Sequence, residues 1–140
     1  MIGRLTPEQS YALLRGSRVA HLGVVSGGDP YVVPVNYVFD GEYVYFHSLP
    51  GKKVEAVRAH PRVCVQVDDV QGDYSWRSVI AFGRCEEVRG DSERAHALGL
   101  LLSLFPHLTP VESLMAADAA SPAPLAFRVR VERVTGMYEG

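Results

Sequence analysis

The sequence lacks both an excess of charge of one sign and a long hydrophobic run, and these absences exclude several classes of protein. Its 140 residues include 14 lysines and arginines and 16 aspartates and glutamates, spread over both halves of the chain. A protein that binds nucleic acid through phosphates needs a basic surface, which this balance does not predict. No apolar run approaches the roughly 20 residues of a membrane-spanning helix, and the first residues resemble a polar helix start rather than a signal peptide. We therefore expect a cytoplasmic protein that binds neither nucleic acid nor membranes.

Cysteine is scarce as well, with only Cys64 and Cys85. Two cysteines cannot staple a fold of this length, and these two lack the spacing of metal ligands. No two histidines have the i, i+4 spacing of a helical metal site. We therefore expect no bound metal ion, and two cysteines that pack within strands as small hydrophobic residues. The glycine-based motifs of P-loops, dinucleotide folds and serine hydrolases are absent too.

Strand-forming segments make up most of what the sequence does contain. Hydrophobic residues account for 47% of the chain and charged residues for 21%, as in a globular domain. Six apolar or alternating runs, joined mostly by short turns, favour a mainly β fold: a six-stranded antiparallel barrel with flanking helices, forming a single domain over residues 1–140. The predicted strands are Val19–Val25, Tyr31–Phe39, Glu42–Ser48, Arg62–Asp68, Arg77–Val88 and Leu125–Val134.

Four helices are predicted between or before these strands. Thr6 begins a capping box for a helix that ends near Arg15. A short helix follows at Lys52–Ala59, and Asp91 caps a longer one. A second capping box at Thr109 opens a brief helix, which a linker over residues 119–124 follows. The apolar face of the longer helix is predicted to consist of Ala95, Leu98, Leu102 and Phe105.

The stretch from Tyr45 to Lys53 contains the only two lysines of the chain, Lys52 and Lys53, and they are adjacent. Ser48 ends a strand and could cap the helix that begins with these lysines. Backbone N–H groups, a hydroxyl and two ammonium groups would then meet at one helix N-terminus, which favours an anion such as a phosphate. The alternative is a solvated Pro-Gly turn with two exposed lysines.

Three further positions are candidates for contact with a ligand. His47 follows Tyr43 and Tyr45 on one strand face, where it is either a pocket residue or an ordinary core or interface residue. Pro34–Asn36 places a proline in a strand, which predicts an edge or a bulge. Free backbone groups there could bind the polar edge of a flat heterocycle, or the segment could be an ordinary edge strand. Trp76, the only tryptophan, could stack on a ligand or cap the barrel.

Seven segments of the chain, taken in order, share features with a known family. They are Val19–Val25, Pro30–Tyr37, Val44–Ser48, Gly51–Lys53, His60–Val63, Ser78–Arg84 and Val131–Gly136. Together they resemble the FMN-binding split-barrel superfamily related to pyridoxamine 5′-phosphate oxidase, and most of all its branch of nitroimidazole-resistance-like flavoproteins. The chain lacks the arginine-rich C-terminal signature with which the oxidase itself binds its substrate. Oxidation of pyridoxamine phosphate is therefore not expected.

The resemblance implies a cofactor site and an assembly. In that family the strand matching Val33, Pro34, Val35 and Asn36 holds the isoalloxazine ring of FMN largely through backbone groups. The positions matching His47, Ser48, Lys52 and Lys53 surround the ribityl phosphate, and the position matching Ser78 approaches the flavin from the facing strand. The family forms homodimers with two FMN sites between the subunits. An open barrel and the aromatic face of Tyr43 and Tyr45, which would otherwise be exposed, also lead us to expect a homodimer.

The function that the resemblance implies is an FMN-dependent oxidoreductase. It would pass electrons from a reduced nicotinamide nucleotide through FMN to a small organic acceptor, while the protein supplies orientation and excludes water. His47 and Trp76 would shape the pocket, with His47 the candidate catalytic residue. Two alternatives remain open: a non-catalytic module that stores or senses flavin, and a relative that binds deazaflavin or haem in the same slot.

Overall fold

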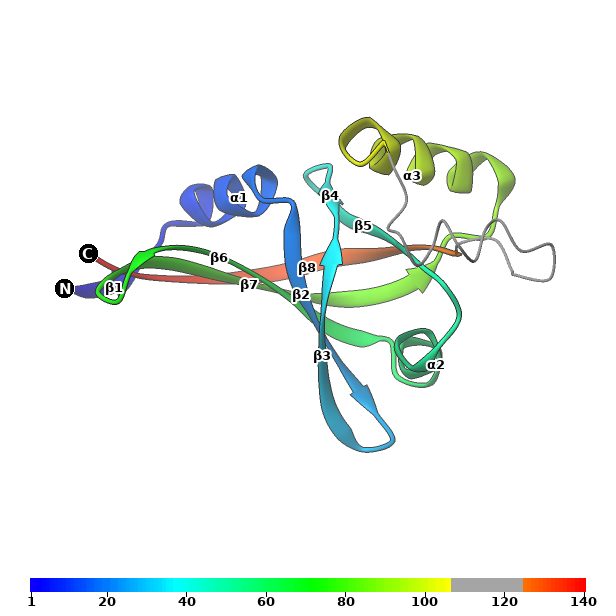
Figure 1. Cartoon of the computed structure of the whole chain (residues 1–140), viewed down its shortest axis with the longest axis horizontal. Coiled ribbons are helices and arrows are strands. Elements are labelled where there is room, and N and C mark those ends of the chain that lie inside the picture. The colour runs from blue at the N-terminus through cyan, green and yellow to red at the C-terminus, as the bar shows by residue number, and fades with distance from the viewer. Residues whose placement is uncertain (107–124) are drawn as a thin grey trace.

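The computed structural model of the chain describes residues 1–106 and 125–140, which form a curled antiparallel sheet of eight strands with three helices around it (Figure 1). The strands are β1 (Ile2–Arg4), β2 (Val19–Ser26), β3 (Asp29–Asn36), β4 (Val38–Phe39), β5 (Tyr43–Ser48), β6 (Arg62–Gly72), β7 (Ser75–Glu87) and β8 (Leu125–Glu139). The helices are α1 (Pro7–Gly16), α2 (Lys52–Ala59) and α3 (Asp91–Leu104). The prediction of a mainly β, split-barrel fold is confirmed.

The number of strands differs from the six that the sequence predicts. The run Tyr31–Phe39 divides at Tyr37, whose backbone N–H donates to the carbonyl of Arg18 at 3.1 Å. The Tyr37 hydroxyl donates to the carbonyl of Leu14 in α1, so this residue is held inward, away from the strand ladder. The first residues of the chain add β1, which pairs with the end of β8.

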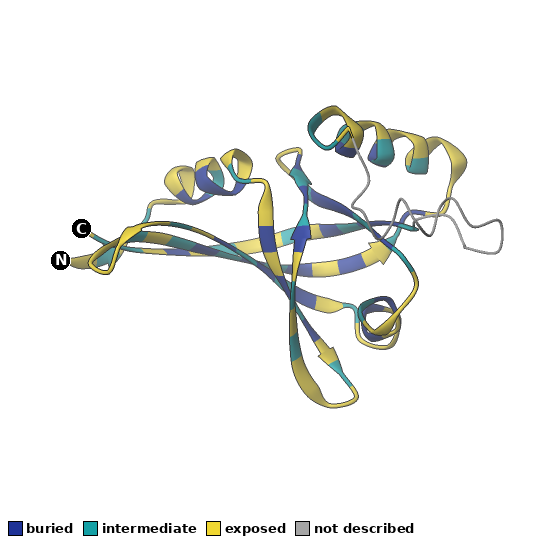
Figure 2. Cartoon of the chain, in the orientation of Figure 1, coloured by how far each residue is buried: buried dark blue, intermediate teal, exposed yellow. Residues whose placement is uncertain are grey.

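The strand order β3-β2-β6-β7-β8-β5-β4 leaves β3 and β4 at the two ends of the sheet. Residues from β3 and β5 nevertheless belong to one core cluster, so the sheet curls on itself around that core. Along β2 and β6, buried residues alternate with exposed or half-buried ones, as the colours along the ribbons show (Figure 2). Leu14 of α1 and Val54 and Val57 of α2 belong to the same core cluster, so both helices pack against it.

The observed helices have nearly the predicted residue ranges, but not all of the predicted N-caps. The Thr6 capping box of α1 is present, and α2 covers the predicted residues. In α3, Gly90 and not Asp91 is the N-cap, and no side chain caps this helix. The helix predicted from Thr109 and the linker after it lie outside the described residues.

The buried face of α3 also differs from the predicted one. Ala97 and Leu101 are buried against Tyr45 of β5, whereas Ala95 and Leu102 are exposed. A row spaced by four residues therefore packs on the sheet, with Leu98 and Phe105 at its margin. Helical periodicity alone is compatible with burial of either Ala95 and Leu102 or Ala97 and Leu101. The contact with Tyr45 determines that the second pair is buried.

A β-bulge in the pairing of β7 with β8 places several arginines on the outer face of the sheet. Phe82 pairs with Arg133 and Gly83 pairs with Val131, so Glu132 is an extra residue in β8. A side chain at Gly83 would overlap the backbone of Arg130, which is why glycine occupies this position.

Candidate functional site

The structure brings the lysine pair next to strand β3. α2 follows directly after β5, and Nζ of Lys52, its first residue, lies 4.7 Å from the centroid of the Tyr31 ring. Tyr31 lies two residues before Val33 on β3. The elements predicted to hold a heterocycle and a phosphate are therefore neighbours in space, although the two segments are separated in the sequence.

Strand β3 is the terminal strand of the sheet, which confirms the edge position predicted from Pro34. Val35 is buried in the core, Val33 and Asn36 are half-buried, and Pro34 is exposed on the outer face. The backbone of an edge strand has one side that no neighbouring strand covers. This side can donate and accept hydrogen bonds at the rim of a flat heterocycle, as the resemblance implies.

The N-terminus of α2 differs in one respect from the prediction. Gly51 is its N-cap, no side chain caps the helix, and the expected cap by Ser48 is wrong. Ser48 faces inward with only 4% of its surface exposed, and its hydroxyl donates to the carbonyl of Leu49 at 2.8 Å. The groups at this helix N-terminus are thus backbone N–H groups, exposed Lys52 and half-buried Lys53.

His47 lies on the side of β5 that carries Tyr43 and Tyr45, and it is half-buried. The two tyrosine rings are 5.9 Å apart, and Tyr45 meets His96 of α3 edge-on at 6.0 Å. Burial, with a further contribution from Asp40, raises the pKa of Tyr45. Helix α3 covers Tyr45 within the chain, whereas Tyr43 and His47 remain half-buried, so the tyrosine face alone gives little support to the predicted homodimer.

Trp76 and Ser78 lie on β7, near the β6–β7 hairpin, and this hairpin is well separated from α2 (Figure 1). The indole Nε1 of Trp76 donates to Glu139 of β8 at 3.0 Å, which ties the start of β7 to the end of β8. Ser78 is half-buried on the outer face. The structure therefore divides the predicted site residues into two groups: those around α2, β3 and β5, and these two residues of β7.

A chain of hydrogen bonds on the outer face leads from Ser78 of β7 through Gln66 of β6 to His21 of β2, the strand next to β3. Nε2 of Gln66 donates to Ser78 and to Asp68, each at 3.0 Å. The amide oxygen of Gln66 therefore faces Nδ1 of His21, 3.0 Å away, and accepts its proton. His21 lies opposite Pro34 in the strand register. The grouping of Ser78, Gln66 and His21 depends on which residues of β2, β6 and β7 pair, so the sequence alone does not predict it.

Other expectations concern the cysteines, metals and membranes. Cys85 is buried, and burial raises the pKa of its thiol to about 12, while Cys64 is half-buried on β6. Within residues 1–106 and 125–140, no three side chains of histidine, cysteine, aspartate or glutamate are grouped so that they could hold a metal ion. In the same residues, no helix has both the length and the apolar character needed to span a membrane.

Comparison with known proteins places this geometry in a family. The sequence profile of the family described as pyridoxamine 5′-phosphate oxidase matches residues 6–137. A protein of Rhizobium meliloti (strain 1021), named uncharacterized protein RA0666, is 30% identical over 101 residues, which are 69% of this chain and 67% of that protein.

Solved structures agree with the sequence comparison. A protein described as FAD-binding, from Mesorhizobium loti, is 32% identical with a TM-score of 0.79, and the alignment covers 100% of this chain and 99% of that one. A proposed 5-nitroimidazole antibiotic resistance protein from Bacteroides thetaiotaomicron is 22% identical with a TM-score of 0.74, covering 99% of this chain and 87% of that one. At that identity the second likeness shows a shared fold.

Proposed function

The chain belongs to the pyridoxamine 5′-phosphate oxidase family, as its sequence motifs indicate, and on this basis we propose that it is a flavin-dependent oxidoreductase. Electrons would pass from a reduced nicotinamide nucleotide through FMN to a small organic acceptor. The Mesorhizobium loti protein, described as FAD-binding and similar over the whole chain, supports a flavin here. FAD contains FMN as one of its two halves, and the elements described above would bind this FMN half in either flavin.

The contact between Lys52 and Tyr31 is the observation that carries this proposal. A flavin has a flat heterocycle at one end of its ribityl chain and a phosphate at the other. The contact brings together an edge strand suited to the heterocycle and a helix N-terminus suited to the phosphate. The residues present therefore fit FMN in chemistry as well as in placement.

Each group of residues has a distinct task in this proposal. The backbone of Val33–Asn36 orients the ring, and Lys52 and Lys53 neutralise the phosphate together with the first N–H groups of α2. His47 and Trp76 shape the pocket. When bound, the flavin supplies the hydride and electron chemistry, and the protein supplies position, electrostatics and exclusion of water.

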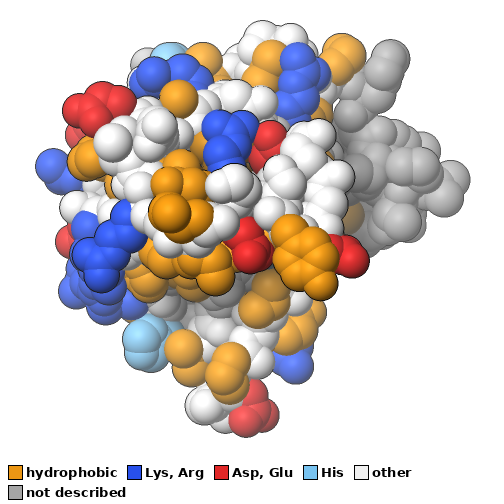
Figure 3. All heavy atoms as spheres, turned by 90° about the vertical axis from the view of Figure 1, so that its left-hand side faces the viewer, with side chains coloured by type: hydrophobic (Ala, Val, Ile, Leu, Met, Phe, Trp, Pro, Cys, Tyr) orange, Lys and Arg blue, Asp and Glu red, His pale blue; other side chains and the backbone are white. Residues whose placement is uncertain are grey.

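We also propose that the protein is a homodimer, now on grounds other than the tyrosine face. Trp76 and Ser78 lie apart from α2, so they would reach a flavin more readily from a second subunit than within one chain. Val19, Val70 and Met137, on the outer face of the sheet, are 54%, 64% and 39% exposed. Apolar side chains also reach the surface at the end of the molecule that carries the termini (Figure 3). An exposed apolar surface of this kind supports a protein partner.

The absorption spectrum and mass of the ligand that copurifies with the protein test this proposal. A flavin spectrum with the mass of FMN or FAD, followed by oxidation of NADH or NADPH by the purified protein, is the expected result. Flavin without turnover would instead favour the storage or sensing alternative. A deazaflavin or haem spectrum would overturn the proposed cofactor.

A further inference from the structure

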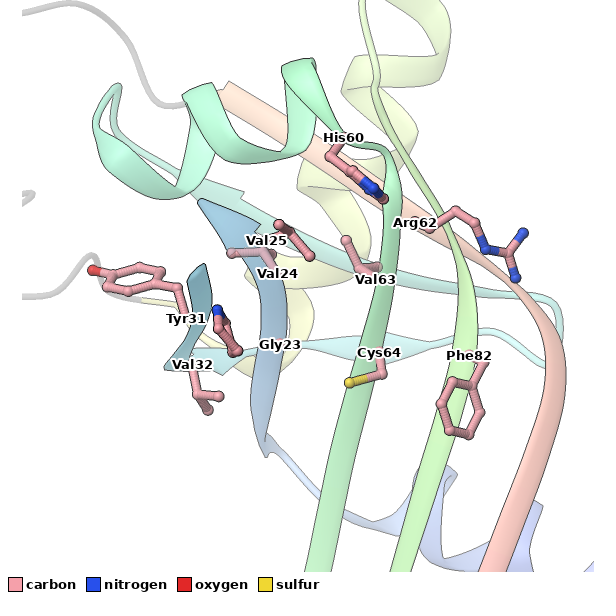
Figure 4. Close-up of a pocket in the computed structure, with 11 residues that line it drawn as sticks. Gly23, Val24, Val25, Tyr31, Val32, His60, Arg62, Val63, Cys64 and Phe82 are labelled. Carbon is pink, nitrogen blue, oxygen red and sulfur yellow. The ribbon is translucent and has the colours of Figure 1, made fainter. Parts of the chain in front are cut away.

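A shallow groove of about 460 Å³ crosses the outer face of the sheet beside β3. Its lining is mostly apolar, with Gly23 at its floor and Phe82 at one side, and Figure 4 shows how four neighbouring strands contribute to it. The volume lies within the range of small-molecule sites. The groove therefore has the size and character to receive a flat ring.

Three arginines lie side by side at one end of this groove. Arg62 pairs with Arg84 in the register of β6 and β7, and Arg84 pairs with Arg130 in the register of β7 and β8. Arg62 also lines the groove, and its side chain extends over β7 toward β8 (Figure 4). Arg133 also borders the groove: it pairs with Phe82, two residues before Arg84 on β7, and its guanidinium lies 3.9 Å from the centroid of the Phe82 ring. We call these four residues the arginine row.

The charge of the arginine row is mostly uncompensated. Glu132 lies 3.4 Å from Arg62, and both side chains are about half exposed. Within the described residues, Arg84, Arg130 and Arg133 make no ion pair with a carboxylate. Like charges directly opposite each other in a sheet are destabilising. An anion bound across the row would relieve that repulsion.

The groove is also continuous with the proposed flavin site. Tyr31 lines one end of it and is the residue that contacts Lys52, while Val32 precedes the strand segment proposed to hold the flavin ring. A ring in the groove would therefore lie beside the flavin ring, and groups attached to its far side would reach the arginine row. A reduced nicotinamide nucleotide has this combination of a flat ring and phosphates.

We infer that the groove and the arginine row form the binding site of the electron donor, with the nicotinamide ring in the groove and the phosphates on the arginines. This inference rests on the proposed function. Arginine binds phosphate through two parallel hydrogen bonds, which suits it to this task. Four arginines and one glutamate leave three positive charges, more than a pyrophosphate neutralises. The site therefore favours NADPH, which has an additional phosphate, over NADH.

The test compares a double variant with a matched control in the protein as isolated, with its bound cofactor. Arg84→Gln/Arg130→Gln removes two members of the row, and Arg18→Gln/Arg89→Gln removes two exposed arginines elsewhere. Calorimetric titration with NADP⁺ measures binding without turnover. We expect the Kd of the double variant to rise about ten- to hundredfold, from the loss of charged hydrogen bonds at an exposed site. The control should stay within about twofold.

A second measurement separates phosphate recognition from general damage. The dihydronicotinamide 1-benzyl-1,4-dihydronicotinamide has the ring but no phosphate. The kcat/KM for NADPH should fall in the double variant, while the value for this donor should not change. If neither donor is oxidised by wild type but NADP⁺ binding still depends on the two arginines, the oxidoreductase proposal fails and the binding site stands.

One result would overturn the inference while leaving flavin binding intact: an equal Kd for NADP⁺ in wild type and Arg84→Gln/Arg130→Gln. If the double variant with this unchanged Kd also changes its oligomeric state, as measured by light scattering, a second copy of the chain covers the groove.

Discussion

Nζ of Lys52 lies 4.7 Å from the centroid of the Tyr31 ring, which links the start of α2 to the edge strand β3. At an exposed site such a cation–π contact contributes about 0.5–1 kcal/mol. A charged hydrogen bond to phosphate contributes about 1.5–3 kcal/mol. The tyrosine ring can therefore hold the lysine near the site, and a phosphate can displace the ring.

The first prediction concerns the lysine pair. Lys52→Met/Lys53→Met keeps the side-chain length and removes both charges. We expect FMN affinity to fall by roughly two to four decades, at about 1.4 kcal/mol per decade, as measured by fluorescence titration. Riboflavin, which has no phosphate, should bind wild type and variant almost equally. Unchanged FMN affinity would mean that the two lysines belong to a solvated turn and do not bind the phosphate.

A second prediction concerns the buried hydroxyl of Tyr37, which donates to the carbonyl of Leu14. Tyr37→Phe leaves that carbonyl without this donor, and we expect the free energy of unfolding at pH 7 to fall by about 1–3 kcal/mol in urea titrations. Tyr74→Phe is the control, because this tyrosine is 79% exposed and should show no measurable change.

The same residue predicts a loss of stability at alkaline pH. Burial raises the pKa of Tyr37 from 10.0 to about 12. The folded protein therefore retains a proton that the unfolded chain releases, so this contribution is present below pH 10 and is lost as pH rises toward 12. The stability difference between wild type and Tyr37→Phe should shrink over this interval. A difference that stays constant from pH 9 to 11.5 would contradict the assignment.

A third prediction uses two glycines in opposite environments. A Cβ at Gly83 would overlap the carbonyl of Arg130 across the bulge, whereas a Cβ at Gly99 in α3 would meet no atom within 4 Å. Gly83→Ala should lower the free energy of unfolding by about 1–3 kcal/mol through crowding. Gly99→Ala should raise it, by up to about 1 kcal/mol, through helix propensity. Equal effects in urea unfolding would contradict the bulge geometry.

The sequence predicts the fold class and the main elements because alternation and capping are local signals. The Thr6 capping box and the α2 bounds depend on neighbouring residues and are confirmed. The division of a strand at Tyr37 depends on Leu14, and the choice of the buried face of α3 depends on Tyr45. Both depend on contacts between distant segments, which local patterns do not record.

In the candidate site too, features set by neighbouring residues are predicted, and features set by the pairing of distant strands are not. The edge position of Pro34 follows from one residue type and is confirmed. The cap by Ser48 fails because inward orientation on β5 depends on the register with β8. The alignment of His21 with Gln66, and of Arg84 with Arg130, follows only from which strands pair. Chemistry that lies across several strands is therefore the part that the sequence does not predict.

The last prediction concerns the homodimer, which would contain the 54% exposed Val19 and the 64% exposed Val70 of the outer face in its interface. A stable interface buries about 800 Å² per partner, and a charge in its apolar part is costly. Val70→Asp should therefore convert the dimer to a monomer, as measured by light scattering. Leu102→Asp is the matched control, because this residue is 52% exposed on α3, on a different surface, and should leave the dimer intact.

Flavin occupancy is a second quantity to measure in Val70→Asp and Leu102→Asp. If Trp76 and Ser78 contact a flavin held by the α2 of the other subunit, Val70→Asp should lose flavin together with its partner, and the loss should be greater at low protein concentration. Leu102→Asp should retain both. A monomeric wild type with full flavin occupancy would show that one chain completes the site, and it would assign Trp76 to capping the end of the barrel through its hydrogen bond to Glu139.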